Sequence, residues 1–352
     1  MTNKQATWQK LRERSEAREN VVKRSQVITA IRSFFAAESF LEVETPLVVP
    51  SPGTEPYLEV FETQLAVDDG RVKRAFLLTS PELAMKKLLV AGFPNIFQLC
   101  KSFRNGEGVS FTHNHEFTIL EWYRAPADYK TIMQDCEKLL LHIFHKLNPT
   151  VKDEVLQYQG SSYQLATPWE RITVAEAFSR YAGVSEEVLH DRDLICAEAV
   201  RKGYQIAERT TWEEAYNQIF LNEVEPKLGF KTPTFLYEYP VAQAALSRKK
   251  KDDPRYAERF ELYMAGLELG NAFSELTDWR EQEARMQADL VERRSLGKTE
   301  YAIDADFIEA LKVGMPESGG IAVGVDRLVM LFLDTTDISD VLLFPTAEIF
   351  SL

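Results

Sequence analysis

Residues 103–123 read FRNGEGVSFTHNHEFTILEWY, and this stretch predicts both the local fold and the kind of ligand. Two runs with alternating side chains flank a short polar loop, a pattern that is typical of a β-hairpin. The odd-numbered residues from Phe117 to Tyr123 share one face of the second strand, because strand side chains repeat every two residues. That face carries an aromatic ring, the Glu121 carboxylate and a phenol, and Arg104 ends the first run. These groups suit a ligand with a base, a phosphate and an amine, such as an aminoacyl adenylate.

The composition predicts a soluble, cytoplasmic, globular protein. The 352 residues are 45% hydrophobic and 27% charged, which is enough for a large core. No apolar run approaches the roughly 18 residues of a membrane span, and residues 1–20 contain no apolar signal region. The three cysteines are too widely spaced for a disulfide framework or a zinc site, so we expect reduced thiols.

The net charge of −13 argues against extensive binding of nucleic acid. A protein that grips a phosphate backbone usually has a basic stripe that neutralises several phosphates. The dense cationic run is RKKK at residues 248–251, and Asp252 and Asp253 follow it at once. We interpret this run as a solvated loop, with a contact site for an acidic partner as the less favoured alternative.

The order of strand and helix patterns predicts an α+β fold in a single domain, residues 1–352. The first 35 residues and residues 81–91 have helical spacing, and residues 57–63 and 74–79 read as strands. A motif-poor stretch, about 128–232, reads as a helical insertion. Its helix candidates are Asp128–Leu147, Thr173–Tyr181, Glu186–Lys202 and Thr211–Val224. Strands dominate again beyond it, so we expect a mostly antiparallel sheet flanked by helices.

The segment 260–277, FELYMAGLELGNAFSELT, predicts a second hairpin with carboxylates on one face. If the AG pair forms a two-residue turn, Glu261 and Glu268 fall diagonally on that face. A hard divalent cation could bridge them, since Mg²⁺ binds nucleotides through one or two carboxylates and phosphate oxygens. If this pair is considered alone, two solvated glutamates on a strand are the alternative interpretation. The residue order that follows, EL-GN-FSEL, favours the metal site. The segment also supplies an amide and another carboxylate, Asn271 and Glu275.

Residues 317–333, ESGGIAVGVDRLVMLFL, read as a strand of small side chains that leads into an apolar helix. The small side chains let a flat ligand approach the backbone closely. Arg327 lies in the first helical turn, where the helix dipole disfavours a cation. A bound phosphate would resolve this conflict through a charge-assisted contact, whereas a surface ion pair with Asp326 or a neighbour is the alternative.

Together, these segments resemble the catalytic core of class II aminoacyl-tRNA synthetases, and the lysyl subgroup in particular. Residues 40–46 (FLEVETP) are similar to the first class motif, residues 103–123 to the second, and residues 319–327 (GGIAVGVDR) to the third. The resemblance extends from about residue 20 to the C-terminus and implies a homodimer built around Pro46. A lysyl-tRNA synthetase also has an N-terminal anticodon-binding OB domain, which we do not expect here because the sequence opens on the helix of the first motif.

Several phrases, including TSPELAMKKLLVAG and TPTFLYEYPVAQAAL, resemble more narrowly the elongation factor P–(R)-β-lysine ligase family. That family keeps the synthetase core and transfers its amino acid to a protein lysine instead of to tRNA. The resemblance implies that (R)-β-lysine is activated with ATP and Mg²⁺ and transferred to elongation factor P. Ala322 stands where lysyl-tRNA synthetases have glycine, and the family's alanine reshapes the amino-acid pocket toward the β-isomer.

The resemblance also implies roles for individual residues. It implies that two catalytic arginines hold ATP, Arg104 at the α-phosphate and Arg327 at the γ-phosphate. Phe117 would stack on adenine. Further contacts to the nucleotide would come from Glu107, His113 and Glu268. Magnesium would bind Glu261 and Glu268. The lysine-like substrate would be recognised by Glu82, Glu121, Tyr123, Asn271, Glu275 and Ala322. Paired carboxylates fit this role, because burying an unpaired ammonium group is costly.

Two positions depart from the family pattern. The family has Arg-x-Glu after the phenylalanine, whereas residues 104–107 read RNGE, so Glu107 comes one place late. His115 replaces a family proline, and we interpret it as a loop histidine and not as a catalytic base.

Two other functions fit the sequence. A truncated lysyl-tRNA synthetase-like enzyme would charge tRNA or another small acceptor, and it would prefer α-lysine. A non-catalytic paralogue would bind amino acid or nucleotide without turnover, although the arginines and glutamates that activation needs are all present.

Overall fold

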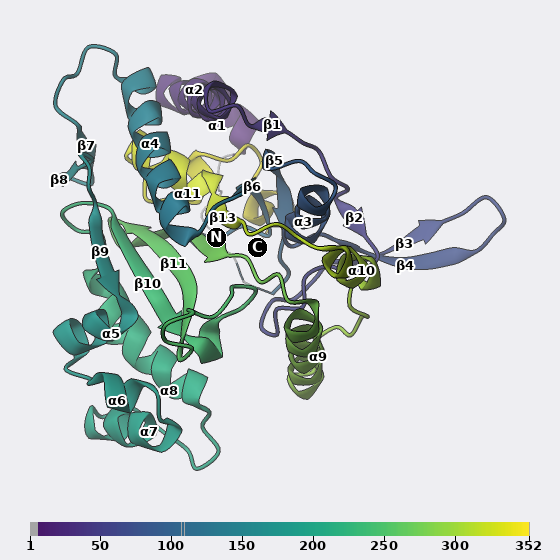
Figure 1. Cartoon of the computed structure of the whole chain (residues 1–352). Helices are drawn as coiled ribbons and strands as arrows, with labels where there is room; N and C mark the ends of the chain where they lie inside the picture. The colour runs from purple at the N-terminus through teal and green to yellow at the C-terminus, as the bar shows by residue number, and fades with distance from the viewer. Residues whose placement is uncertain (1–5, 107, 109, 352) are drawn as a thin grey trace.

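The computed structural model describes residues 6–106, 108 and 110–351, and an eight-stranded sheet forms its centre (Figure 1). The strand order is β1-β5-β6-β13-β12-β11-β10-β9. Only the edge pairs β1–β5 and β9–β10 are parallel among these described strands. The predicted α+β fold with a mostly antiparallel sheet is confirmed. The strands are β1 (Leu41–Glu42), β5 (Asn95–Phe103), β6 (Glu116–Arg124), β9 (Glu170–Thr173), β10 (Thr234–Pro240), β11 (Tyr256–Met264), β12 (Leu267–Ser274) and β13 (Gly319–Gly324).

The middle of the sheet brings three distant segments side by side. β5 and β6 form the first predicted hairpin, and β11 and β12 form the second, with Met264 opposite Leu267. β13 pairs with β6 on one side and with β12 on the other, so Ala322 lies opposite both Glu121 and Asn271. Residues that are directly opposite on neighbouring strands share a face. Three predicted site residues therefore form a row across one face of the sheet.

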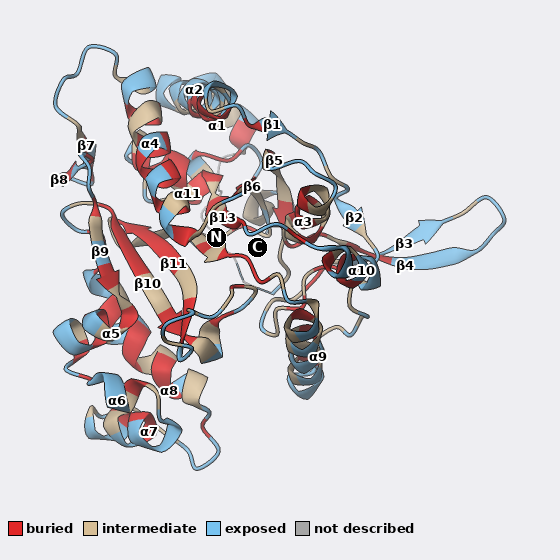
Figure 2. Cartoon of the chain, in the orientation of Figure 1, coloured by how far each residue is buried: buried red, intermediate tan, exposed pale blue. Residues whose placement is uncertain are grey.

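The other face of the sheet carries the main core. Three helices cover it: α2 (Ser15–Ala37), α4 (Tyr129–Leu147) and α11 (Val325–Leu333). Their apolar side chains pack on fully buried strand residues such as Trp122 and Phe260. Figure 2 shows these strands and the inner sides of the helices as buried. Alternation then directs the odd-numbered neighbours, Glu121 and Glu261, to the opposite face.

Two smaller helical groups flank that opposite face. One consists of α3 (Glu82–Val90), α9 (Trp279–Ser295) and α10 (Ala305–Val313), whose core includes Ile96 and Tyr123 of the sheet. The other has its own core with Leu236 and Tyr263 of the sheet. Its helices are α5 (Val174–Ala177), α6 (Glu186–Leu189), α7 (Arg192–Arg201), α8 (Trp212–Ile219) and the π-helical turns η1 (Phe178–Ala182) and η2 (Phe220–Val224).

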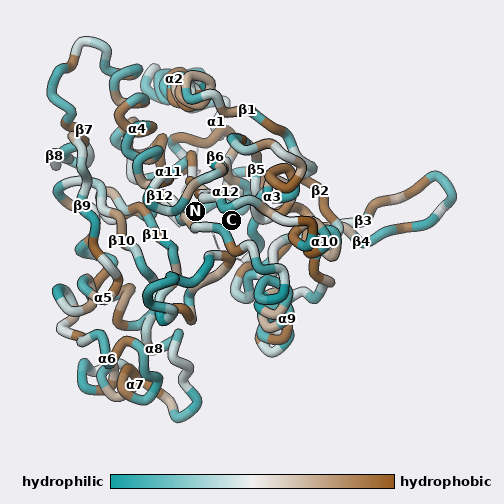
Figure 3. The backbone as a smooth tube through the Cα atoms, in the orientation of Figure 1, coloured by the Kyte–Doolittle hydropathy of each residue, from teal (hydrophilic) through white to brown (hydrophobic). Residues whose placement is uncertain are grey.

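The segment predicted as a helical insertion, about 128–232, also contains strands. β7 (Val155–Tyr158) and β8 (Ser161–Gln164) form a separate hairpin, and β9 joins the main sheet beside β10. The sequence analysis did not predict α9 and α10. Figure 3 shows why for α9, which is hydrophilic along much of its length. Its buried residues include two polar side chains, Gln282 and Arg293, so it lacks a clear apolar stripe.

The remaining elements are short. β2 (Val48–Val49), β3 (Glu62–Ala66) and β4 (Val72–Leu77) form a small sheet, and the β3–β4 hairpin projects from the body of the protein (Figure 1). The others are α1 (Thr7–Glu13), α12 (Thr346–Ile349), η3 (Glu225–Lys227), η4 (Val241–Gln243) and η5 (Ile338–Asp340). Within the described residues, every helix is too short or too polar to cross a membrane.

Candidate active site

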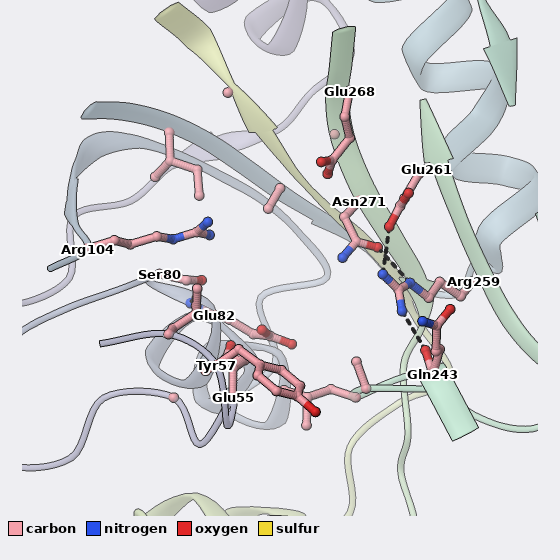
Figure 4. Close-up of a pocket in the computed structure, with 18 of the residues that line it drawn as sticks. Glu55, Tyr57, Ser80, Glu82, Arg104, Gln243, Arg259, Glu261, Glu268 and Asn271 are labelled. Atoms are coloured by element: carbon pink, nitrogen blue, oxygen red, sulfur yellow. Dashed lines mark hydrogen bonds and ion pairs between the residues drawn. The ribbon is translucent and has the colours of Figure 1, made fainter. Parts of the chain in front are cut away.

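A cavity of about 670 Å³ opens on the face of the sheet that carries the row of site residues. Its walls come from β6, β11, β12 and β13, from the start of α3, from α8 and α9, and from the loop 53–58. Figure 4 shows Arg104 and Glu82 pointing into this space from one side and Glu268 from the other. Segments from the whole length of the chain thus meet at one cavity.

One wall of the cavity combines an arginine with an aromatic ring. Arg104 follows β5 and Phe117 lies near the start of β6, and both line the cavity. The Arg104 guanidinium carbon is 5.2 Å from the centre of the Phe117 ring, which is a cation–π distance. A ring that faces a cavity beside a cation is suited to a planar base joined to a phosphate.

Arg327, at the start of α11, also lines the cavity. Its Nη2 donates a hydrogen bond to His113 Nε2 at 2.8 Å, and its Nη1 donates to the backbone oxygen of Glu268 at 2.9 Å. Because arginine is always the donor, Nε2 of His113 is the unprotonated nitrogen, and Nδ1 carries the hydrogen toward Ser110 Oγ at 2.9 Å. His113 therefore supports Arg327 through Nε2.

Asp326 does not serve as the ion-pair partner of Arg327. Its Oδ1 instead pairs with Arg24 Nη2 of α2 at 2.6 Å, and its Oδ2 accepts from the backbone N–H of Thr118 at 2.8 Å. Of the alternative interpretation of Arg327, the ion pair with Asp326 is therefore wrong, whereas a loose ion pair with a neighbour is present, because Arg327 Nη1 lies 3.8 Å from Glu268 Oε2. Arg24, Thr118 and Asp326 tie α2, β6 and α11 together beneath the cavity wall.

Glu261 and Glu268 lie on neighbouring strands, as predicted, but their surroundings differ. Arg259 Nη2 is 2.7 Å from Glu261 Oε1, and the hydroxyls of Tyr239 and Tyr263 donate to Oε2 at 2.5 and 2.6 Å. Glu268 faces the cavity with 38% of its side chain exposed, and its carboxylate is 3.8 Å from Arg327. Although the side chain reaches the cavity, the surrounding protein keeps bulk water away from it; this desolvation, and then the charge of Glu261, raise the pKa of Glu268 to about 7.

The pair fits a divalent cation in donor type. Carboxylate oxygens are the donors that Mg²⁺ prefers, and the charge of Glu261 adds to burial in raising the pKa of Glu268, so positive charge is favoured beside this pair. No described group of three or more His, Cys, Asp or Glu side chains could hold a metal ion by itself. Substrate phosphates would therefore have to supply the remaining ligands.

Arg259 is a site residue that the sequence analysis missed. Its guanidinium reaches Glu261, donates to Asn271 Oδ1 at 3.1 Å and donates to the backbone oxygen of Gln243 at 2.5 Å (Figure 4). Since the amide oxygen of Asn271 is occupied, its NH₂ group is left to donate, which suits a substrate carboxylate. The signal was present, because Arg259, Glu261 and Tyr263 alternate on one strand.

Behind Glu82 lies a buried cluster of carboxylates. Glu121 accepts hydrogen bonds from Ser80 and, at 3.2 Å, from the hydroxyl of Tyr123. Glu275 contacts the ammonium group of Lys86, which also donates to Glu82. Among the described residues, Ser80, Glu82, Asn271 and Ala322 line the cavity, whereas Glu121, Tyr123 and Glu275 lie behind its wall. Their direct contact with a substrate stays a prediction.

Burial changes the acidity of this cluster. Burial, and then the charge of Glu82, raise the pKa of Glu121 to about 8. Burial raises the pKa of Glu275 to about 7, although the Lys86 ammonium opposes that change. Both carboxylates therefore gain from a cation that enters the cavity.

The small side chains of β13 have a clear packing reason. A Cβ atom at Gly320 would lie 2.3 Å from the Tyr123 ring and 2.7 Å from Glu275 Oε1. Ala322 and Gly324, on the same face, line the cavity. The close approach predicted for this strand thus serves both the buried cluster and the cavity floor.

Glu107, the predicted nucleotide contact, lies outside the described residues.

The match to known proteins agrees with this geometry. Residues 2–348 match the model of the tRNA synthetases class II (D, K and N) family. The chain belongs to this family. It is 38% identical over 330 residues to the lysine–tRNA ligase of Carboxydothermus hydrogenoformans, which covers 94% of this chain and 66% of that protein. It is 40% identical over 334 residues to the lysine–tRNA ligase of Magnetococcus marinus, which covers 94% and 64% respectively.

This class II family member spans just under two thirds of the length of those relatives. The family match includes all three motifs on which the sequence analysis relied. Residues of the second and third motifs, β5–β6 and β13–α11, line the cavity described above.

Proposed function

We propose that the protein is an ATP-dependent ligase that activates (R)-β-lysine as an adenylate and transfers it to the ε-amine of a lysine on elongation factor P. One observation carries the proposal: a single cavity is lined by Arg104, Phe117 and Arg327 and also by Glu82, behind which the buried carboxylates lie. The first set of residues suits ATP, and the carboxylates suit an amino acid with two ammonium groups. The class II family membership supports adenylate chemistry.

In the first step, the substrate carboxylate attacks the α-phosphorus of ATP, and pyrophosphate leaves. Arg104 neutralises charge on the α-phosphate, Arg327 neutralises charge on the γ-phosphate, and Phe117 stacks on adenine. Such preorganised positive charge is the main source of catalysis in phosphate chemistry. Glu261 and Glu268 would hold Mg²⁺, which supplies further positive charge at the phosphates.

In the second step, the neutral ε-amine of the acceptor attacks the acyl carbonyl, AMP leaves, and the new amide nitrogen loses a proton. The outer wall of the cavity suits a cationic acceptor, because Glu213, Asp289 and Glu292 line it. Burial is the first cause that raises the pKa of both Glu213 and Asp289, which makes them better proton acceptors. The same wall would repel the phosphates of a nucleic acid.

The cationic run at residues 248–251 supports a protein acceptor over nucleic acid. Arg248 pairs with Glu258 at 2.8 Å, and Lys250 pairs with Glu238 at 2.8 Å. Side chains that are already neutralised by neighbours contribute little to a phosphate-binding stripe.

We further propose a homodimer through the segment around Pro46. This proline is exposed, and so are the apolar neighbours Leu41, Leu47 and Val48. An exposed apolar patch of this kind marks an interaction surface. Light scattering of the purified protein tests this proposal.

A lysyl-tRNA ligase activity is the second candidate, because the relatives at 38–40% identity are lysine–tRNA ligases. The two candidates differ in amino acid and acceptor. Ala322 on the cavity floor supports the β-isomer, whereas a preference for α-lysine and transfer of label to tRNA would support the second candidate.

The test is pyrophosphate exchange with α- and β-lysine, followed by transfer of labelled amino acid to purified elongation factor P or to tRNA. We expect exchange with β-lysine, label on the factor, and loss of exchange in Arg104→Ala. Arg201→Ala is the matched control, since the exposed Arg201 pairs with Glu198 on α7, which contributes no residue to the cavity. An adenylate that never passes its label to the factor would rule out the proposed acceptor, and saturable ATP binding without exchange would support a non-catalytic protein.

A further inference from the structure

Lys86 is the one ammonium group within the buried carboxylate cluster in the described structure, and it lies one helical turn after Glu82 on α3. Its side chain is 1% exposed. Its Nζ contacts Glu275 and lies 2.5 Å from Glu82 Oε1. A lysine is very rarely this buried unless opposite charges surround it.

The cluster has a charge balance that Lys86 determines. It contains three carboxylates, on Glu82, Glu121 and Glu275, and one ammonium group. Glu55 of the loop 53–58 also acts on Glu82, but Arg104 offsets the charge of Glu55, so this pair adds no net charge. When all four are ionised, two negative charges remain without an internal partner. A diamino acid brings two ammonium groups, so the net charge of the cluster and its ligand becomes zero when the ligand binds. Without Lys86, three carboxylates would face two ammonium groups, and one carboxylate would have to stay protonated.

Lys86 also fixes where the carboxylates point. Glu82 belongs to α3, whereas Glu275 follows β12, and the shared ammonium group connects the two elements. In the described residues, Glu275 Oε1 has no hydrogen-bond partner, and a Cβ at Gly320 would lie 2.7 Å from it. One oxygen of Glu275 is thus held by Lys86, and the other is directed toward the glycine strand of the cavity floor.

We propose that Lys86 is a positioning residue that sets the charge of the amino-acid pocket, so that the pocket matches a substrate with two ammonium groups. The inference rests on the proposed function and adds a residue to it. The acidity of the cluster agrees with it: burial alone would lower the pKa of Lys86, but Glu275 and Glu82 outweigh burial and raise it. Lys86 is therefore a permanent cation in the resting protein.

The test compares Lys86→Gln and Lys86→Arg with the wild type in β-lysine-dependent pyrophosphate exchange between pH 6 and 9. Lys87→Gln is the matched control, because the next residue on the same helix pairs with Asp304 and Asp306 near the surface. For Lys86→Gln we expect the KM for the amino acid to rise about tenfold while the KM for ATP is unchanged. We also expect the pH above which the amino-acid KM stays constant to rise by about one unit. Without the Lys86 ammonium group, the carboxylates of the cluster lose their protons only at higher pH.

Lys86→Arg keeps the charge, so we expect it to keep the wild-type pH midpoint even if the larger guanidinium raises the KM. A Lys86→Gln enzyme with wild-type KM and pH profile would overturn the proposal. Equal loss of ATP and amino-acid binding would also overturn it, because that result indicates a general structural role. If Lys86→Gln does not fold, Lys86→Arg decides, and a shifted pH midpoint in that variant is the overturning result. Failure of the proposed function can be told apart from failure of this inference, because it would appear in the wild type as absence of pyrophosphate exchange with β-lysine.

Discussion

Raising the pH from 6 to 8 should strengthen binding of the diamino acid about 50-fold, because Glu121 must lose a proton before it can pair with an ammonium group. Its pKa is about 8 as a result of burial and the charge of Glu82. At that pKa about 1% of the carboxylate is ionised at pH 6 and about half at pH 8, and the ratio gives the gain. The substrate side-chain amine stays protonated over this range, since the pKa of such an amine is about 10.

Isothermal titration calorimetry with β-lysine and a non-hydrolysable ATP analogue measures this effect. Titration in two buffers of different ionisation enthalpy also counts the protons that are released on binding. In Glu121→Gln we expect weaker binding at pH 8 and most of the pH dependence lost. Glu116→Gln is the matched control, because Glu116 lies on the same strand, is exposed and pairs only loosely with Lys101 at 3.5 Å.

Two results would refute the reasoning. Affinity that does not change between pH 6 and 8 would mean that Glu121 is already ionised or does not interact with the substrate. A Glu121→Gln variant with the full pH dependence would assign the titration to another group, of which Glu275, with a pKa of about 7, is the first candidate.

Four further outcomes are expected. The pKa of Glu121 is higher in the folded chain than its ordinary 4.5, so the stability that Glu121 contributes is full below about pH 4.5 and is lost as the pH rises through about 8. In denaturant unfolding, the free energy of unfolding of Glu121→Gln should therefore not show this decrease with pH. Gly320→Ala should cost about 1–3 kcal/mol in the same assay, because the new Cβ overlaps a tyrosine ring at 2.3 Å. Glu268→Gln should raise the Mg²⁺ concentration for half-maximal exchange about tenfold, whereas an unchanged Mg²⁺ dependence would exclude it as a ligand. Arg24→Met should destabilise the protein by about 3–5 kcal/mol, because Asp326 would be left buried without its cation, and a much smaller loss in thermal unfolding would contradict that view.

Periodicity was enough to predict the centre of the sheet. Alternation placed Phe117 to Tyr123 on one face, and the AG turn fixed the register that sets Tyr263 opposite Glu268. The run of small residues at 319–324 also predicted β13, and pairing in the sheet brings Ala322 between Glu121 and Asn271. These features depend on local patterns, which a sequence displays directly.

The parts that were not predicted depend on contacts between distant segments. α9 buries Gln282 and Arg293, so its inner face does not look apolar. Arg259 and Lys86 were overlooked because charged side chains are usually expected at the surface, and their partners become apparent only when β11, β12 and α3 meet. Charge balance inside a cavity is a property of the assembled fold.

The link from Arg24 to Asp326 has a consequence for how the chain is made. The helix that bears Arg24 leaves the ribosome about 300 residues before its partner, or roughly 15–60 s at ordinary rates of synthesis. During that interval the arginine remains hydrated and α2 lacks one of its anchors. Arg327 immediately follows Asp326, so the part of the cavity that carries Arg327 takes its final form only when α2 and α11 come together.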